Sequence, residues 1–150
     1  MEPITTEILV LGAGPGGYAA AFYAADKGKQ VTLVEQSPRL GGICLNVGCI
    51  PSKALLHATE ILRESKQSAA RGIAFGAVQI DLEKLRAWKI GILDKLGQGI
   101  KTLAQHRKVQ VIHGRGHFED SQTLRVETSE GKRCVCYEKA IIDVGSKPTL

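Results

Sequence analysis

Two short apolar runs, separated by a glycine-rich turn and a helical stretch, open the chain. Residues 7–11 and 31–35 are each bounded by turn residues, which is typical of parallel strands buried on both faces. Between them, the alanine-rich residues 18–27 predict a helix, which Gly28 would end as a C-cap. The first 35 residues therefore predict one complete β-α-β unit.

The hydrophobic spacing then changes to that of long helices. A helix is predicted from Pro51 to about residue 70, because a first helical turn tolerates proline. Asp81 is a good N-cap for a second long helix. Its apolar residues recur every three or four positions and predict one packed face. That face comprises Leu82, Leu85, Trp88, Ile92, Leu96, Ile100 and Leu103.

From residue 109 the pattern returns to short strands. These are predicted at 109–113, 117–119, 123–128, 133–137 and 140–144, with a hairpin turn at 129–132 and a buried last strand. The expected fold class is α/β, a Rossmann-like parallel sheet with helices and a small β-hairpin.

Cys134 and Cys136 share a strand face and are interpreted as small packed hydrophobes. His113 and His117 are interpreted as ordinary surface or core residues.

Composition excludes several classes of protein. The chain has 150 residues, 43% hydrophobic and 23% charged, which suits one ordinary globular domain. Its net charge of +5 is dispersed and not interleaved with aromatics, so a nucleic-acid surface is not expected. Residues 8–25 carry no charge, but Pro15 and the glycines interrupt them and no basic residue precedes them. We expect no membrane span and a cytoplasmic location.

The glycine-rich turn carries a G-x-G-x-x-G pattern at Gly12, Gly14 and Gly17. It follows a strand, opens a helix, and is joined by an acidic residue, Glu35, at the end of the next strand, as dinucleotide binding requires. The glycines permit a tight turn, approach to a pyrophosphate and close helix packing, while Glu35 can bind a ribose diol. The pattern predicts an adenine dinucleotide, either FAD or NAD.

Residues 41–53 contain two cysteines, Cys44 and Cys49, for which three roles compete. A structural disulfide is rare in the cytosol, and two sulfurs do not complete a metal site. A cycling dithiol is favoured, although a regular helix would place the side chains about 140° apart. The segment must therefore bend, which Gly48 allows. The following helix and Lys53 would stabilise a Cys49 thiolate.

The glycine fingerprint and residues 41–53 resemble the pyridine nucleotide–disulfide oxidoreductases, and residues 45–57 most resemble the dihydrolipoamide dehydrogenase branch of that family. The resemblance implies that Cys44 exchanges with the substrate disulfide and that Cys49 lies against the flavin. It implies electron transfer from dihydrolipoamide through the disulfide and FAD to NAD. The FAD-binding residues it implies are Gly12, Gly14, Gly17, Glu35, Gln36, Gly41, Gly42, Ile43, Cys44, Lys53 and Gly116.

The same resemblance implies partners and a domain order. The partner would be dihydrolipoamide on the lipoyl domain of a 2-oxoacid dehydrogenase complex, and family members are homodimers. Residues 1–150 would be the N-terminal FAD-binding domain with the redox disulfide, without the NAD and dimerisation domains, so turnover by this chain alone is not expected. The alternatives are a non-catalytic FAD-binding module or gene remnant, and a fragment of a mercuric or glutathione reductase.

One departure from the family pattern concerns the end of the last predicted strand. Asp143 and Val144 stand where the family has a small residue followed by threonine or alanine. A carboxylate at the end of a buried strand needs a partner, because burying an unpaired charge is costly. The sequence alone does not identify that partner.

Overall fold

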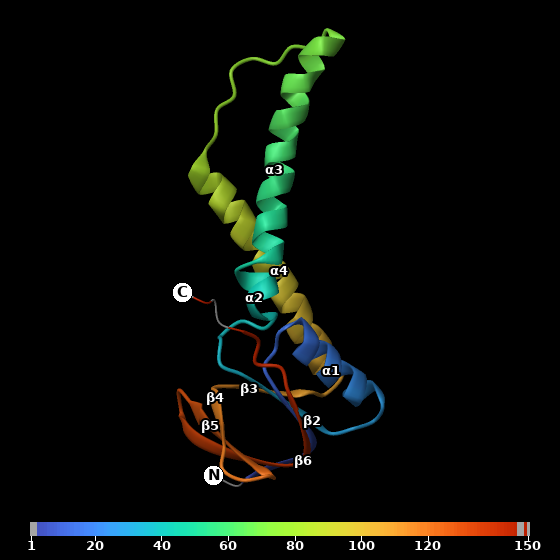
Figure 1. Cartoon of the computed structure of the whole chain (residues 1–150), viewed down its shortest axis with the longest axis vertical. Helices are drawn as coiled ribbons and strands as arrows, with labels where there is room; N and C mark the ends of the chain where they lie inside the picture. The colour runs from blue at the N-terminus through green and yellow to red at the C-terminus, as the bar shows by residue number, and fades with distance from the viewer. Residues whose placement is uncertain (1–2, 147–148, 150) are drawn as a thin grey trace.

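The computed structural model describes residues 3–146 and 149. It has an α/β arrangement in which some helical segments lie on a mixed sheet and others extend away from it (Figure 1). The elements in chain order are β1 Ile4–Leu11, α1 Pro15–Asp26, β2 Val31–Glu35, α2 Gly42–Asn46, α3 Cys49–Ser68, a 3₁₀ turn Ala69–Arg71, α4 Leu82–His106, β3 Gln110–His113, β4 Arg115–Phe118, β5 Thr123–Thr128 and β6 Gly131–Ile142.

The sheet has the strand order β3-β2-β1-β6-β5-β4. Strands β3, β2, β1 and β6 run parallel, and β5 and β4 add an antiparallel ribbon to the β6 edge. The carboxyl ends of the four parallel strands therefore meet at one edge, where open α/β sheets bind their ligands. The predicted Rossmann-like α/β class is confirmed.

The core lies on both faces of this sheet. On one face, Val10 and Leu33 pack with Phe22 of α1 and Ala104 of α4. On the other, Leu9 and Val34 pack with residues of the β5–β6 ribbon. Successive residues of a strand point to opposite faces, so a strand buried on both faces must be continuously apolar. This explains the uninterrupted hydrophobic runs at 7–11 and 31–35.

The last two predicted strands are in fact one. Strand β6 runs without a break because its first half pairs with β5 and its second half with β1. The predicted burial of residues 140–144 is wrong: Ile142 and Val144 are largely exposed. These residues lie beyond the end of the β5 pairing, so β5 does not flank them.

The helices begin earlier than predicted. Helix α1 starts at Pro15 instead of Tyr18, with Pro in the first turn, and α3 starts at Cys49 instead of Pro51. Proline fixes a helical φ and lacks only an N–H that the first turn leaves unpaired, so Pro15 and Pro51 both fit inside these helices. Asp81 caps α4 as predicted, because its carboxylate accepts hydrogen bonds from the N–H groups of Glu83 and Lys84.

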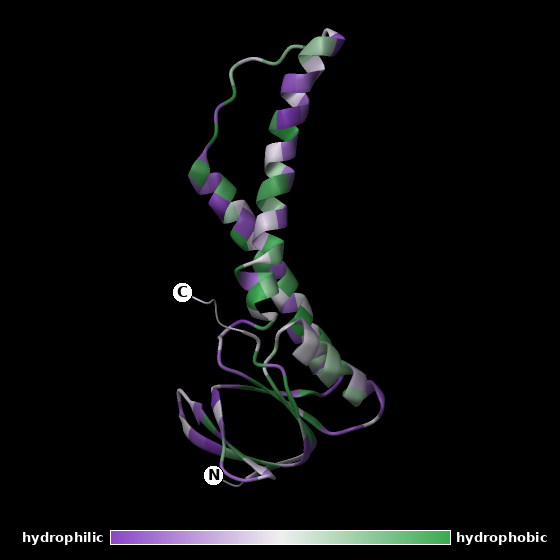
Figure 2. Cartoon of the chain, in the orientation of Figure 1, coloured by the Kyte–Doolittle hydropathy of each residue, from purple (hydrophilic) through white to green (hydrophobic). Residues whose placement is uncertain are grey.

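A helical arm formed by α3 and the first half of α4 extends away from the sheet (Figure 1). Hydrophobic residues occur along it far from the core (Figure 2). The prediction of one packed face on residues 82–103 is therefore wrong: Trp88, Leu96 and Leu103 are more than 40% exposed, and of the predicted residues only Ile100 packs against the core. The second half of α4 packs on the sheet through Ala104. None of the helices in the described part of the chain is long and apolar enough to cross a membrane.

Two leucines test whether stability resides in the sheet and not in the arm. Leu33 is fully buried in β2 and Leu56 is 66% exposed on α3. Leu33→Ala should lower the free energy of unfolding by about 2–5 kcal/mol through lost burial and a cavity. Leu56→Ala should change it by less than about 0.5 kcal/mol. Urea denaturation followed by circular dichroism measures both, and equal losses would contradict this division.

Candidate active site

The glycine-rich turn between β1 and α1 is built by close backbone contact. Gly12 has a φ of +101°, and a Cβ there would overlap the carbonyl oxygen of Asp143. A Cβ on Gly17 would in turn overlap the carbonyl oxygen of Gly12. A Cβ on Gly42 would lie 2.7 Å from the Cα of Gly14, so the start of α2 rests directly on the turn. This last contact brings the cysteine segment to the glycine turn.

Glu35 is fixed to the same turn. Its side chain is only 8% exposed, and its Oε2 accepts a hydrogen bond of 2.7 Å from the N–H of Ala13. Its Oε1 accepts a bond of 2.8 Å from the N–H of Ser37. Backbone N–H groups thus satisfy the buried charge, and each carboxylate oxygen keeps a second lone pair for a ligand hydroxyl.

A cleft of about 780 Å³ lies at the carboxyl edge of the parallel strands. It collects eight of the predicted site residues: Gly12, Gly14, Glu35, Gln36, Gly42, Ile43, Cys44 and Gly116. Gly17 and Gly41 are buried. Cys49 and Lys53 are exposed on the first turns of α3 and do not line the cleft.

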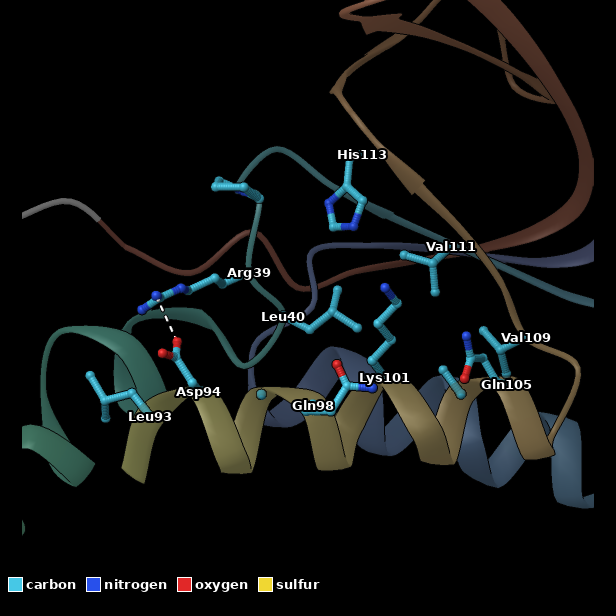
Figure 3. Close-up of a pocket in the computed structure, with 13 residues that line it drawn as sticks. Arg39, Leu40, Leu93, Asp94, Gln98, Lys101, Gln105, Val109, Val111 and His113 are labelled. Carbon is cyan, nitrogen blue, oxygen red and sulfur yellow. Dashed lines mark ion pairs between the residues drawn. The ribbon is translucent and has the colours of Figure 1, made fainter. Parts of the chain in front are cut away.

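A second cavity, of about 560 Å³, lies between α4, β3 and residues 38–40 (Figure 3). Arg39 and Asp94 form an ion pair of 2.7 Å beside it, and the ring of His113 also borders it. His113 is exposed and its Nδ1 lies 2.8 Å from the carbonyl oxygen of Ser37, which is an ordinary surface arrangement. No predicted site residue lines this cavity.

The chain reverses between the two cysteines. Helix α2 carries Cys44 and ends at Asn46, and the N–H groups of Val47 and Gly48 both donate to the carbonyl oxygen of Ile43. Helix α3 then begins at Cys49. The bend predicted at Gly48 is therefore confirmed, and it removes the separation that a continuous helix would impose. All four cysteines, each within the described residues, are free thiols.

The two thiols of Cys44 and Cys49 interact directly. The pKa of Cys44 is raised above its ordinary value, chiefly by a side-chain hydrogen bond with Cys49, and further by burial and by the charge of Cys49. The positive charge of Lys53 acts in the opposite direction on the pKa of Cys44. The Cys44 thiol thus loses its proton less readily than an isolated thiol, and Cys44 needs a proton acceptor before it can act as a nucleophile.

Asn46 is a cleft residue that sequence reasoning missed. Its Nδ2 donates hydrogen bonds to the carbonyl oxygens of Leu40 and Gly42, at 3.1 and 2.9 Å, which orients the amide. Its Oδ1 is buried and has no partner among the described residues. A buried acceptor without a donor is costly, so this atom is suited to a donor group of a ligand. Nothing local in the sequence distinguishes it from a helix-ending asparagine.

Asp143 has a partner, as its position at a strand end requires. Its Oδ2 accepts a hydrogen bond of 2.5 Å from the N–H of Gly17, in the first turn of α1. The residue also lines the cleft. One carboxylate therefore lies between the end of β6 and the start of α1, directly at the predicted phosphate position.

The fold and the cleft together define a dinucleotide-binding domain with a thiol pair beside it. The chain belongs to the pyridine nucleotide-disulphide oxidoreductase family, whose sequence model matches residues 6–150. Members of this family are FAD-binding flavoproteins that use NAD(H), in agreement with the cofactor prediction.

Several known proteins are similar along the whole chain. A dihydrolipoyl dehydrogenase of Vibrio cholerae is 45% identical over 147 residues, and one of Haemophilus influenzae is 46% identical over 148. Each alignment covers 98% of this chain but 31% of the relative, so the chain spans about a third of their length. The HOCl-induced flavoprotein disulfide reductase RclA from Escherichia coli, solved as a Cu(II) complex, superposes with a TM-score of 0.78 at 27% identity, covering 100% of this chain and 30% of RclA.

The raised pKa of Cys44 can be tested by alkylation. Cys49→Ala removes the hydrogen bond that raises this pKa, so the pH midpoint of Cys44 alkylation should fall. Lys53→Met removes a charge that lowers it, so the midpoint should rise. Peptide mass spectrometry after iodoacetamide pulses across pH 6–11 separates Cys44 from Cys134 and Cys136. Shifts in the same direction for both variants would refute the assignment.

Proposed function

We propose that this chain is the FAD-binding and dithiol-bearing part of a dihydrolipoyl dehydrogenase. The observation that carries the proposal is the shared cleft: Cys44 lines the same cavity as the glycine turn and Glu35. A thiol pair within reach of a bound dinucleotide is what disulfide–nicotinamide electron transfer requires. The similarity to dihydrolipoyl dehydrogenases over 98% of the chain supports the same substrate class.

The residues of the cleft fit FAD on their own chemistry. Gly12, Gly14 and Gly42 line the cleft without side chains, Glu35 keeps free lone pairs, and Asn46 Oδ1 has no donor among the described residues. Bound FAD would supply two-electron redox chemistry. In this proposal Gly12, Gly14 and Gly17 approach the pyrophosphate and Glu35 binds the ribose diol. The remaining contacts would come from Gln36, Gly41, Gly42, Ile43, Cys44, Lys53 and Gly116.

The thiol chemistry can be written with this chain's own residues. The Cys44 thiolate attacks one sulfur of the lipoyl disulfide, forming a mixed disulfide and releasing the other lipoyl sulfur as a thiolate. The Cys49 thiolate then attacks the Cys44 sulfur, forming the Cys44–Cys49 disulfide and releasing the second lipoyl sulfur. Two electrons pass from the cysteine pair to the lipoyl group. The reverse sequence oxidises dihydrolipoamide, the proposed physiological direction.

For a full catalytic cycle of dihydrolipoamide oxidation, the chain would need a base and an NAD site in addition to its own residues. The raised pKa of Cys44 calls for a base, which we place, with the NAD site and the dimer interface, in the part of the relatives that this chain does not span. On this proposal residues 1–150 are the FAD-binding domain of a homodimeric enzyme. Its partner is the lipoyl domain of a 2-oxoacid dehydrogenase complex. The proposed compartment is the cytoplasm, because a cycling dithiol suits reducing surroundings.

A second candidate is a non-catalytic module with weak FAD binding. The carboxylate of Asp143 at the first turn of α1 favours it, because a negative charge opposes a pyrophosphate at that place. A fragment of a mercuric or glutathione reductase is the less favoured alternative within the family. The following two experiments separate these possibilities.

Thiol exchange is tested without the flavin. At alkaline pH, with oxidised lipoamide in large excess, the chain should gain a Cys44–Cys49 disulfide while Cys134 and Cys136 stay reduced. Cys49→Ser should instead accumulate a lipoamide adduct on Cys44, because the resolving thiol is gone. Cys134→Ser is the matched control and should behave as wild type. Peptide mass spectrometry identifies the products, and an adduct confined to Cys49 would reverse the assigned roles.

Flavin binding is tested by reconstitution. The purified chain, mixed with FAD and freed of excess cofactor, should keep a flavin spectrum. Anaerobic dithionite titration should then produce a long-wavelength band at the two-electron stage, which Cys49→Ser should abolish and Cys134→Ser preserve. Lipoamide reduction by NADH is not expected from residues 1–150 alone. If the chain retains no flavin, the non-catalytic module is favoured over the dihydrolipoyl dehydrogenase proposal.

A further inference from the structure

Asp143 is held in place by its backbone at the end of β6. Its N–H donates a hydrogen bond of 2.8 Å to the carbonyl oxygen of Leu11, the last residue of β1. Its own carbonyl oxygen lies where a Cβ of Gly12 would be. The residue therefore sits across the glycine turn, and the direction of its side chain is set by two neighbouring strands.

The carboxylate of Asp143 lies on the first turn of α1. Its Oδ2 is 2.5 Å from the N–H of Gly17, and its carboxyl atoms lie 3.0–3.5 Å from the positions that Cβ atoms on Gly14 and Gly16 would occupy. The glycines leave the space that this side chain uses. The same open space is what a glycine-rich turn ordinarily leaves for a phosphate.

Among the described residues, helix α1 has no other anionic cap. Its N-cap residue, Gly14, makes no side-chain hydrogen bond, and its first turn contains no acidic residue. The positive end of the helix dipole therefore acts on Asp143, which reaches it from 126 residues along the chain. Among the ion pairs found between described residues none includes Asp143, so the N-terminal turn of α1 is its main electrostatic partner.

We propose that Asp143 is a built-in competitor for the pyrophosphate and sets the affinity of this chain for FAD. The inference rests on the proposed function, because it concerns the same cleft. A pyrophosphate and the Asp143 carboxylate seek the same N–H groups, and both are negative. FAD binding then requires the side chain to turn away and the helix to exchange one anion for another. FAD is then bound less tightly than it would be with an uncharged residue at position 143.

The test is a pair of measurements on Asp143→Asn, which keeps the shape of the side chain and removes its charge. FAD affinity, followed by quenching of flavin fluorescence, should rise about tenfold or more. The melting temperature without FAD should fall by roughly 2–5 °C, because the helix loses its anionic cap. Asp143→Ala, which also removes the hydrogen-bond acceptor, should show both effects. Glu130→Gln, at the exposed β5–β6 turn, makes the same change of charge away from the cleft and should show neither.

A rise in FAD affinity together with a fall in melting temperature is the result expected of a residue that competes with the pyrophosphate. If FAD affinity and melting temperature both fall in the Asp143 variants, Asp143 only supports the fold and the inference is overturned. If wild type and both Asp143 variants bind FAD equally, the inference alone fails and the proposed function stands. If none of the proteins binds FAD, the inference and the proposed function fail together.

Discussion

Direct backbone contact at the glycine turn is the constraint on which the site depends. Three segments meet there without side chains between them: the end of β6 rests on Gly12, the start of α1 on the same residue, and the start of α2 on Gly14. A methyl group at any of these contacts would force the segments apart. The cleft, the position of Glu35 and the approach of the cysteine segment all follow from that close packing.

Charge and hydrogen bonding then divide the cleft into two ends. At the strand end, backbone N–H groups hold the carboxylates of Glu35 and Asp143. At the α2 end, a side-chain hydrogen bond with Cys49 raises the pKa of Cys44. Under the proposed function, cofactor binding would depend on electrostatics at one end of the cleft and electron transfer on sulfur chemistry at the other.

The sequence was sufficient wherever structure depends on local pattern. The β1–α1–β2 unit, the Asp81 cap and the bend at Gly48 all follow from nearby residues. The sequence was insufficient where the burial of a residue depends on segments that are distant along the chain. The exposure of Ile142 depends on where β5 stops pairing, and that of Trp88 on how far α4 lies from the sheet. The need of Asp143 for a partner was predictable, but Gly17 could not be identified because only the fold brings it close.

The pairing of β1 with β6 also sets the order in which the molecule can assemble. The strands at the two ends of the described chain are neighbours in the sheet, and contacts between such distant segments form slowly because a long loop must first close. The β1–α1–β2 unit can form from the first few dozen residues, before β6 is available. In any state in which the β1–α1–β2 unit is formed and β6 is not yet paired, the N-terminus of α1 lacks its anionic partner Asp143.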